Sequence, residues 1–226
     1  MNFPVACHLI REKLFVVGLA LAAGLASLRA AAPIVTVEQK PPRIEHLTFE
    51  PGHPPPVLQN SPGVEAAFCG TTFGCTCGLY AETPKFTFGL GAAKITSIIV
   101  STRAHIIIWT PVGGPPEYLA HEETHRAISE HYYRDAGAVA KRLTEQLAGK
   151  KLDLPKKKTG AMLDEALDGL KNQLIADFMK EIGDRSEFAQ DRFDTITNHG
   201  REPISNEEAM ARAIADEAEH RKNSQR

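Results

Sequence analysis

The string His121-Glu122-Glu123-Thr124-His125 combines residue types and a spacing that could perform metal chemistry. On an α-helix, residues four apart lie on the same face, about one turn apart along the axis. The two histidines could therefore bind one metal ion, and Glu122 could act on a water molecule beside it. This His-Glu-x-x-His arrangement is typical of zinc peptidases. The alternative is a helix that carries two ordinary histidines.

The surrounding sequence predicts the helix that this motif needs. Pro115 and Pro116 follow two glycines, and proline is favoured in the first turn of a helix. No residue between them and Tyr133 breaks a helix. The motif lies on a stripe with helical spacing that consists of His121, His125, Ile128 and Tyr132. The histidines should therefore face the interior of the protein.

A catalytic zinc ion usually has three protein ligands, so the chain must supply one more. His131 has the spacing of the third ligand in metzincins, but Ile128 stands where those enzymes have a helix-breaking glycine. On a continuous helix, His131 would point about 80° away from His121. His199 lies where a later long helix should end, beside a glycine that permits a sharp reversal. The sequence therefore leaves three alternatives: the third ligand is His199, it is His131, or it is neither of them.

Residues 193–200 read Phe-Asp-Thr-Ile-Thr-Asn-His-Gly and form a second motif. Within it, Asp194 could orient one of the motif histidines by accepting a hydrogen bond. The two motifs together resemble a group of bacterial secreted proteins that are predicted zinc-dependent proteases. In that group the second motif usually begins with Tyr, where this chain has Phe193. The resemblance covers about residues 95–200, and it implies a zincin fold with His199 as the third zinc ligand.

The resulting hypothesis is a zinc metallopeptidase that hydrolyses peptide bonds. Zn²⁺ held by His121, His125 and His199 would activate water, and Glu122 would carry its proton to the leaving amine. Candidates for stabilising the oxyanion are Tyr118, Tyr132 and Arg201. One alternative is a non-enzymatic exported metal-binding or interaction protein that uses the site structurally. Another alternative is an enzyme that acts on cell-wall peptides.

Composition and the N-terminus indicate an exported protein. The chain has 226 residues and a formal charge of −2, which suits one domain and argues against a nucleic-acid partner. Arg11 and Lys13 precede an apolar run at 14–28, so residues 1–32 are predicted to be a signal peptide. We expect a secreted or periplasmic protein with a peptide or protein substrate and no stable membrane span after cleavage. An uncleaved N-terminal membrane anchor is the alternative, and the sequence does not indicate an oligomeric state.

Three cysteines lie close together in a Gly-rich stretch. In an exported protein, a disulfide from Cys69 to either Cys75 or Cys77 would staple this stretch as a loop. A metal site is the weaker alternative, because no His or fourth Cys follows at the spacing of a zinc ribbon.

The remaining sequence predicts an α+β fold. Prolines interrupt residues 33–63, which we interpret as an extended lead-in or linker before a zincin-like catalytic domain at 64–222. Strands are expected near 79–88, at 95–100 and at 105–109, with a turn at 101–104. Helical patterns follow at 136–147, from 159, and from a cap at Ser205 to about 220. The expected architecture is a small, mostly antiparallel sheet preceding a helical, zincin-like bundle, in which a strand edge could hold an extended substrate.

Overall fold

The structure is a computed structural model that describes residues 32–59, 67–83, 92–154 and 160–224. Within it, Pro33–Arg226 form a compact unit. The predicted signal peptide and its alternative, a membrane anchor, fall almost entirely on residues 1–31, outside the described residues. In the part of the chain that is described, no helix combines the length and the apolar character that a membrane span requires.

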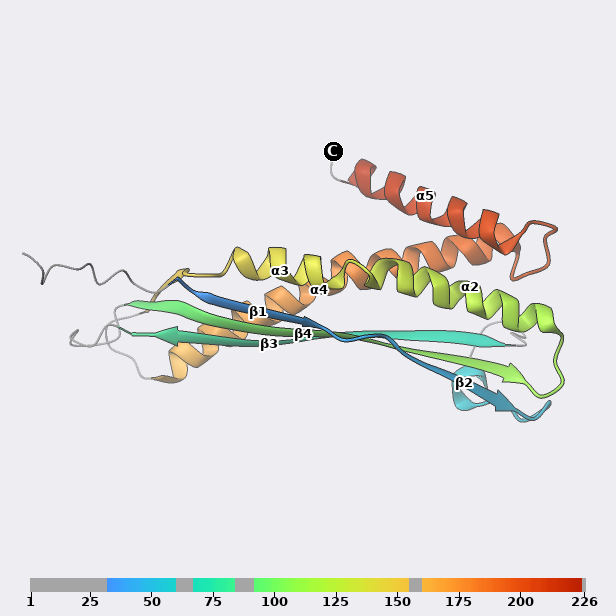
Figure 1. Ribbon diagram of the computed structural model, residues 1–226, viewed down its shortest axis with the longest axis horizontal. Helices are drawn as coiled ribbons and strands as arrows, with labels where there is room; N and C mark the ends of the chain where they lie inside the picture. Colours follow the sequence, from blue (N-terminus) through green and yellow to red (C-terminus); the bar gives the residue numbers. More distant parts are fainter. Residues whose placement is uncertain (1–31, 60–66, 84–91, 155–159, 225–226) are drawn as a thin grey trace, which may run out of the picture. The chain divides into compact units, whose positions relative to one another are not determined.

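A long central strand, β4 (Ala92–Pro111), organises the sheet (Figure 1). Along one edge, β1 (Ile34–Gln39) and β2 (Arg43–Phe49) pair with it in parallel, one after the other. Along the opposite edge, β3 (Phe68–Glu82) pairs with it antiparallel over almost its whole length. The short β5 (Lys151–Asp153) is antiparallel to the start of β4. The sheet therefore combines parallel and antiparallel pairings.

This topology confirms the α+β class and corrects the expectation of a mostly antiparallel sheet. The segment interpreted as a linker supplies both parallel strands, because its prolines lie between and after the strands instead of inside them. The turn expected at 101–104 is also wrong. Thr102 and Ala104 are buried while Arg103 is exposed, so the alternation of a strand continues through this stretch.

The Gly-rich stretch with the three cysteines is also part of a strand, β3, and not a stapled loop. Cys69, Cys75 and Cys77 are all free thiols in the structure. Six residues of extended strand separate Cys69 from Cys75 by about 20 Å, whereas disulfide Cα atoms lie about 4.4–6.8 Å apart. The expected disulfides from Cys69 are therefore incompatible with this strand.

The helices follow the sequence pattern closely and lie largely on one side of the sheet (Figure 1). The motif helix is α2 (Pro116–Tyr133), followed by α3 (Ala136–Glu145). The long α4 (Gly160–Thr197) returns beside them, and α5 (Asn206–Ser224) packs on α4. A short helix, α1 (Pro56–Gln59), follows β2. The backbone N–H of Glu208 donates to the Ser205 hydroxyl at 3.2 Å, as the predicted cap requires.

Two buried clusters hold these elements together. The larger one lies between the inner face of the sheet and the helices α3 and α4. The second joins α2, α4 and α5 and consists of Ile128, Tyr132, Ala189, Phe193, Ala209 and Ala213. Each large side chain in such a cluster contributes about 1.5–3 kcal/mol when it is fully buried. The second cluster thus fixes the motif helix α2 against the C-terminal half of α4.

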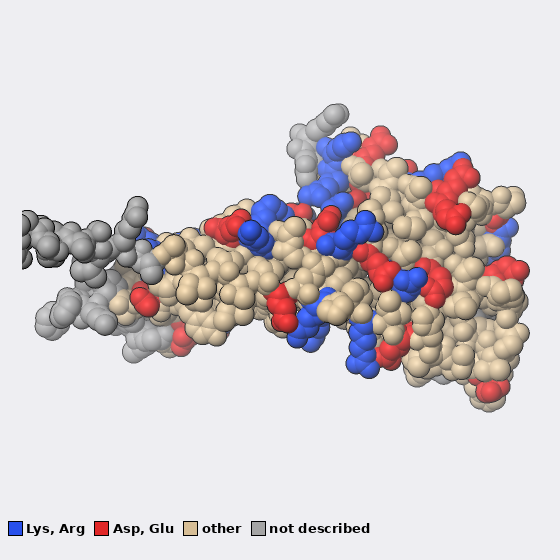
Figure 2. Space-filling model, in the orientation of Figure 1, with Lys and Arg blue, Asp and Glu red and all other residues tan. Residues whose placement is uncertain are grey.

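Charged contacts connect the same helices. On α4, Glu181 accepts hydrogen bonds from Arg142 of α3 at 2.7 Å and Arg221 of α5 at 3.0 Å. Basic and acidic side chains are interspersed over the face of the molecule that Figure 2 shows. Because both arginines are well exposed, each pair should stabilise the fold by less than about 1 kcal/mol.

A buried ion pair anchors α5 more strongly. Glu217 of α5 is only 3% exposed, and it accepts two hydrogen bonds from Arg185 of α4, at 2.7 and 2.9 Å. The hydroxyl of Tyr132 in α2 donates to the same carboxylate at 3.2 Å. Three helices therefore meet at one buried charge, which would lose its compensating cation if Arg185 were removed.

Removal of this arginine should destabilise the protein substantially. We expect Arg185→Ala to lower the free energy of unfolding by about 3 kcal/mol, because Glu217 would stay buried without its cation. The matched control is Arg212→Ala, which removes an exposed pair with Glu208 on α5 and should cost less than about 0.5 kcal/mol. Urea unfolding of the three proteins measures both effects. Equal losses in the two variants would contradict the anchoring role of Glu217.

Candidate metal centre

Two helices bring three atoms that could bind a metal ion close together. His121 and His125 project from α2, and their Nε2 atoms lie 3.2 Å apart. Asp194 projects from α4, and its Oδ1 lies 3.1 Å from Nε2 of His121 and 3.0 Å from Nε2 of His125. Among the described residues, these three side chains form a group whose ligand atoms could hold a metal ion. The helix spacing in the sequence thus produces the paired imidazoles that it predicted.

The dimensions of this triangle fit a small divalent cation. Zinc binds imidazole nitrogen and carboxylate oxygen at about 2.0–2.2 Å, so the corners of its tetrahedron lie about 3.3–3.6 Å apart. The observed separations of 3.0–3.2 Å are close to this edge. Two imidazoles and one carboxylate also suit zinc and several other divalent transition metals. The donor set therefore fits a metal, without identifying which one.

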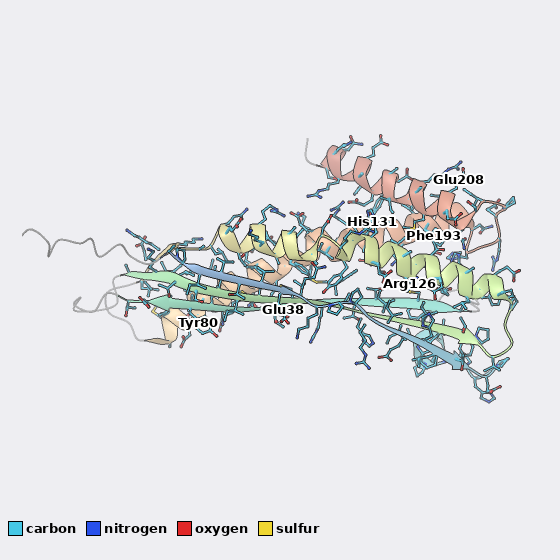
Figure 3. The ribbon with its side chains drawn as sticks, in the orientation of Figure 1. Glu38, Tyr80, Arg126, His131, Phe193 and Glu208 are labelled. Atoms are coloured by element: carbon cyan, nitrogen blue, oxygen red, sulfur yellow. The ribbon has the colours of Figure 1, made fainter. Side chains whose placement is uncertain are left out.

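Packing explains why the rings are held here. Phe193, buried between α2 and α5 in Figure 3, precedes Asp194 on α4. Its ring centroid lies 4.9 Å from those of both His121 and His125, stacked on the first and edge-on to the second. Phe193 thus packs against both imidazoles, and this contact places the carboxylate of the next residue, Asp194, beside them.

The second ring nitrogens of the histidines have different surroundings. Nδ1 of His125 is hydrogen-bonded to the side-chain oxygen of Gln190, one turn before Asp194 on α4. Nδ1 of His121 is buried and has no hydrogen-bond partner among the described residues. It faces the backbone of Gly200, where an added Cβ would lie 3.5 Å from this nitrogen. This distance is an ordinary van der Waals contact, so glycine is favoured at this position by its φ of 80° and not by lack of space.

The end of α4 adopts an unusual backbone conformation. Asn198, His199 and Gly200 have φ values of 46°, 53° and 80°, so three successive residues are left-handed. Such a conformation is disfavoured for a histidine, and strained residues of this kind cluster at functional sites. The chain then turns back, and the N–H of Arg201 donates to the carbonyl of Thr197 at 2.8 Å. This reversal brings His199 beside the triangle.

His199 and His131 occupy very different positions relative to the expected third ligand. Nδ1 of His199 lies 3.7 Å from Oδ1 of Asp194, at the rim of the site, with the side chain 55% exposed. Its role as the third ligand stays a prediction, because Asp194 is the residue that completes the triangle. His131 lies on the opposite side of α2 from Arg126, toward α5 (Figure 3), and burial followed by nearby Arg134 lowers its pKa. His131 therefore does not contribute to this group.

A cleft of about 940 Å³ opens onto the triangle. Its walls are residues 67–73 of β3 and its approach, the N-terminal half of α2, the C-terminal half of α4, and residues 199–201. Glu122 is only 7% exposed and lines the cleft together with Tyr118 and Arg201. Tyr132, the other oxyanion candidate, does not line it and donates its hydroxyl to Glu217 instead.

The titratable groups of the site shift one another's pKa values. Burial tends to raise the pKa of Asp194, but the hydrogen bonds and charges of the two histidines outweigh it and hold the pKa far below its usual range. Burial conversely tends to lower the pKa of His125, and contacts with Asp194 and the charge of Glu122 raise it overall. Burial, with the charges of Glu122 and Glu123, raises the pKa of Cys69 to about 12. Cys69 is thus a neutral thiol in the wall of the cleft.

Two features of the site were not predicted from the sequence: Asp194 in the triangle, and Gln190 behind His125. The sequence does contain a trace of them, because Gln190 and Asp194 are four residues apart, as His121 and His125 are. Two i,i+4 pairs on helices that face each other can interlock. That spacing becomes meaningful only when α4 is known to lie against α2.

Comparisons of the chain with protein-family models, with curated proteins and with solved structures find no match.

Proposed function

We propose that the chain is a divalent-metal-dependent peptidase in which His121, His125 and Asp194 hold the metal. The observation that carries the proposal is the triangle of two imidazole nitrogens and one carboxylate oxygen, 3.0–3.2 Å apart, in the wall of a cleft. Zn²⁺ is the cation that we expect, because it readily accepts this donor set with one position left open. The triangle lies between packed helices, which favours tight binding.

A divalent cation in this position would polarise a carbonyl oxygen and make a water molecule more acidic. Glu122 is the base that we assign to this water, since it is nearly buried and lines the same cleft as both histidines. It would accept a proton and pass it to the leaving amine. Tyr118 and Arg201 line the cleft and could donate hydrogen bonds to the oxyanion.

The wall formed by β3 supports a peptide as the substrate. Among the described strands, β3 pairs with β4 alone, so its other edge is available along the cleft. Residues 67–73 line the cleft consecutively, which corresponds to about 20 Å of extended chain. A peptide could be held there by main-chain hydrogen bonds as one more strand. Such a site suits protein or cell-wall peptides and does not discriminate between them.

The cleft also bears on the non-enzymatic alternative. A structural metal site is closed, with all of its positions filled by protein. Here the three donors line a cleft of about 940 Å³, which leaves room for a substrate beside them. The open position therefore favours an enzyme over a protein that uses the metal only for stability.

Replacement of the proposed base should separate chemistry from metal binding. We expect Glu122→Gln to lower kcat/KM by about 100- to 10,000-fold, because the water loses its proton acceptor. Zn²⁺ should remain bound, since Glu122 is not one of the three donors. Mass spectrometry of a peptide library measures cleavage, and the metal content of the purified variant is the control. Cleavage at the wild-type rate would exclude this role for Glu122.

A second pair of variants distinguishes the two candidates for the third ligand. We expect Asp194→Ala to weaken Zn²⁺ binding by at least about 100-fold, more than the loss of a group that only orients a ligand usually costs. His199→Ala should weaken it by about tenfold or less, because its ring lies at the exposed rim of the site. Competition with a chromophoric chelator measures both dissociation constants. The reverse order would make His199 the third ligand and Asp194 an orienting residue.

We also propose that the protein is exported by its N-terminal segment. The expected result is a mature chain that lacks about the first 32 residues, found in the periplasm or the medium, because the apolar run at 14–28 suits a cleaved signal peptide. N-terminal sequencing of the expressed full-length chain checks this. A full-length chain in the membrane fraction would favour the N-terminal anchor instead.

A further inference from the structure

Gln190 contacts the metal-site helix at three points. Its side-chain Nε2 donates to the hydroxyl of Ser129 at 2.8 Å and to the backbone carbonyl of His125 at 3.3 Å. Its Oε1 is hydrogen-bonded to Nδ1 of the same histidine. A single side chain of α4 therefore holds both the backbone and the ring of His125.

These contacts determine which way the amide points. A carbonyl oxygen can only accept a hydrogen bond, so the NH₂ group of Gln190 must face the carbonyl of His125. The amide oxygen is then left for the imidazole, and it too can only accept. Nδ1 of His125 must therefore carry a proton, whether or not Nε2 also carries one for the Asp194 carboxylate at 3.0 Å. Nε2 is then the nitrogen that could give its lone pair to a cation, after losing any proton of its own.

Ser129 and Thr71 fix the amide in turn. The Ser129 hydroxyl is fully buried and lies 3.1 Å from the carbonyl of His125 and 2.7 Å from the hydroxyl of Thr71. Ser129 has one proton, which it can donate to the carbonyl while it accepts from Gln190 and from Thr71. Every hydrogen-bonding group in this set then has a partner. Because Thr71 lies in β3 and lines the cleft, the chain of contacts runs from the cleft wall to the imidazole.

We infer that Gln190 is a positioning residue that holds His125 with Nδ1 protonated and with Nε2 directed at His121 and Asp194. Ser129 and Thr71 keep the amide of Gln190 in the orientation that this role requires. The part of this inference that concerns metal affinity rests on the proposed function, whereas the assignment of the ring proton does not. Without Gln190, the His125 ring can rotate away from His121 and Asp194, or it can keep its only proton on Nε2. Either change leaves no Nε2 lone pair directed at the proposed metal position.

The first test needs no metal. In the metal-free wild-type chain, NMR of the histidine rings should detect a proton on Nδ1 of His125 that exchanges slowly with water, because it is hydrogen-bonded to Gln190. Gln190→Met, which has a similar length and no acceptor oxygen, should lose this protection. If the wild-type ring is protonated on Nε2 and never on Nδ1, the inference is overturned.

The second test measures Zn²⁺ affinity. We expect Gln190→Met to raise the dissociation constant for Zn²⁺ by about 10- to 100-fold, as is usual when a residue that orients a ligand is lost. Gln173→Met is the matched control, because Gln173 lies on the same helix, is exposed and donates a hydrogen bond to Asp177, so this variant should bind Zn²⁺ as the wild type does. Gln190→Glu retains an acceptor for the Nδ1 proton but loses the NH₂ donor to Ser129 and to the His125 carbonyl, so it should recover only part of the affinity. Unfolding curves of all variants show whether the fold persists.

The outcomes separate this inference from the proposed function. A wild-type chain that binds no Zn²⁺ would contradict the metal site, and the ring-proton measurement would still decide whether Gln190 positions His125. A chain that binds Zn²⁺ with equal affinity in the wild type and in Gln190→Met would refute the positioning role alone. Equal exchange protection of the Nδ1 proton in the wild type and in Gln190→Met would refute the role of the amide oxygen as the acceptor.

Discussion

The site depends on one packing constraint, the contact of α2 with α4 through the ring of Phe193. This residue is fully buried and touches both motif histidines, so it sets how closely the two helices can approach. At that separation, a carboxylate one residue further along α4 reaches both imidazoles. Three polar atoms are thereby placed about 3 Å apart next to an apolar cluster. Such a concentration of donors is costly unless hydrogen bonds or a cation compensate it.

The same packing sets the electrostatics of the cleft. Asp194, between the helices, remains ionised because the hydrogen bonds and charges of two imidazoles outweigh its burial. Cys69, on β3, remains neutral because burial, and then the charges of Glu122 and Glu123, raise its pKa. The two acidic groups therefore differ because of the different partners that each has in the cleft. The cleft therefore has one wall with an ionised donor set and another with a neutral strand, an arrangement that suits a peptide backbone.

Much of the helical part could be predicted from the sequence, because its apolar residues recur at helical spacing and its ends carry recognisable residues. Pro116 starts α2 and Ser205 caps α5, as expected. The motif histidines face inward for the same reason. Asp194 was expected to accept a hydrogen bond from one motif histidine, and its carboxylate lies 3.0–3.1 Å from both of them. That it completes a triangle of donors could not be predicted, since this depends on how α2 and α4 pack together through residues about seventy positions apart. No local sequence pattern indicates how closely α2 and α4 approach each other.

The strands were predicted less well, for related reasons. Proline-rich residues 33–59 look unable to fold by themselves, yet two short runs between the prolines find partners on β4. Similarly, the stretch 101–104 has turn-like residue types, but each of them fits the alternation that a sheet with one covered face demands. In both places the long-range pairing with β4 overrides the local preference.

The parallel pairing of β1 and β2 with β4 has a kinetic consequence. Ile34 is aligned with Ser97, more than sixty residues later, so this edge of the sheet can close only after a large loop has been ordered. The hairpin-like β3–β4 pair and the helices have shorter sequence separations and should assemble first. Until β1 and β2 dock, the edge of the twenty-residue strand β4 that they cover in the native fold lacks these partners. An open edge of that length is prone to pair with other chains, so folding intermediates of this protein should be more prone to aggregation than its native state.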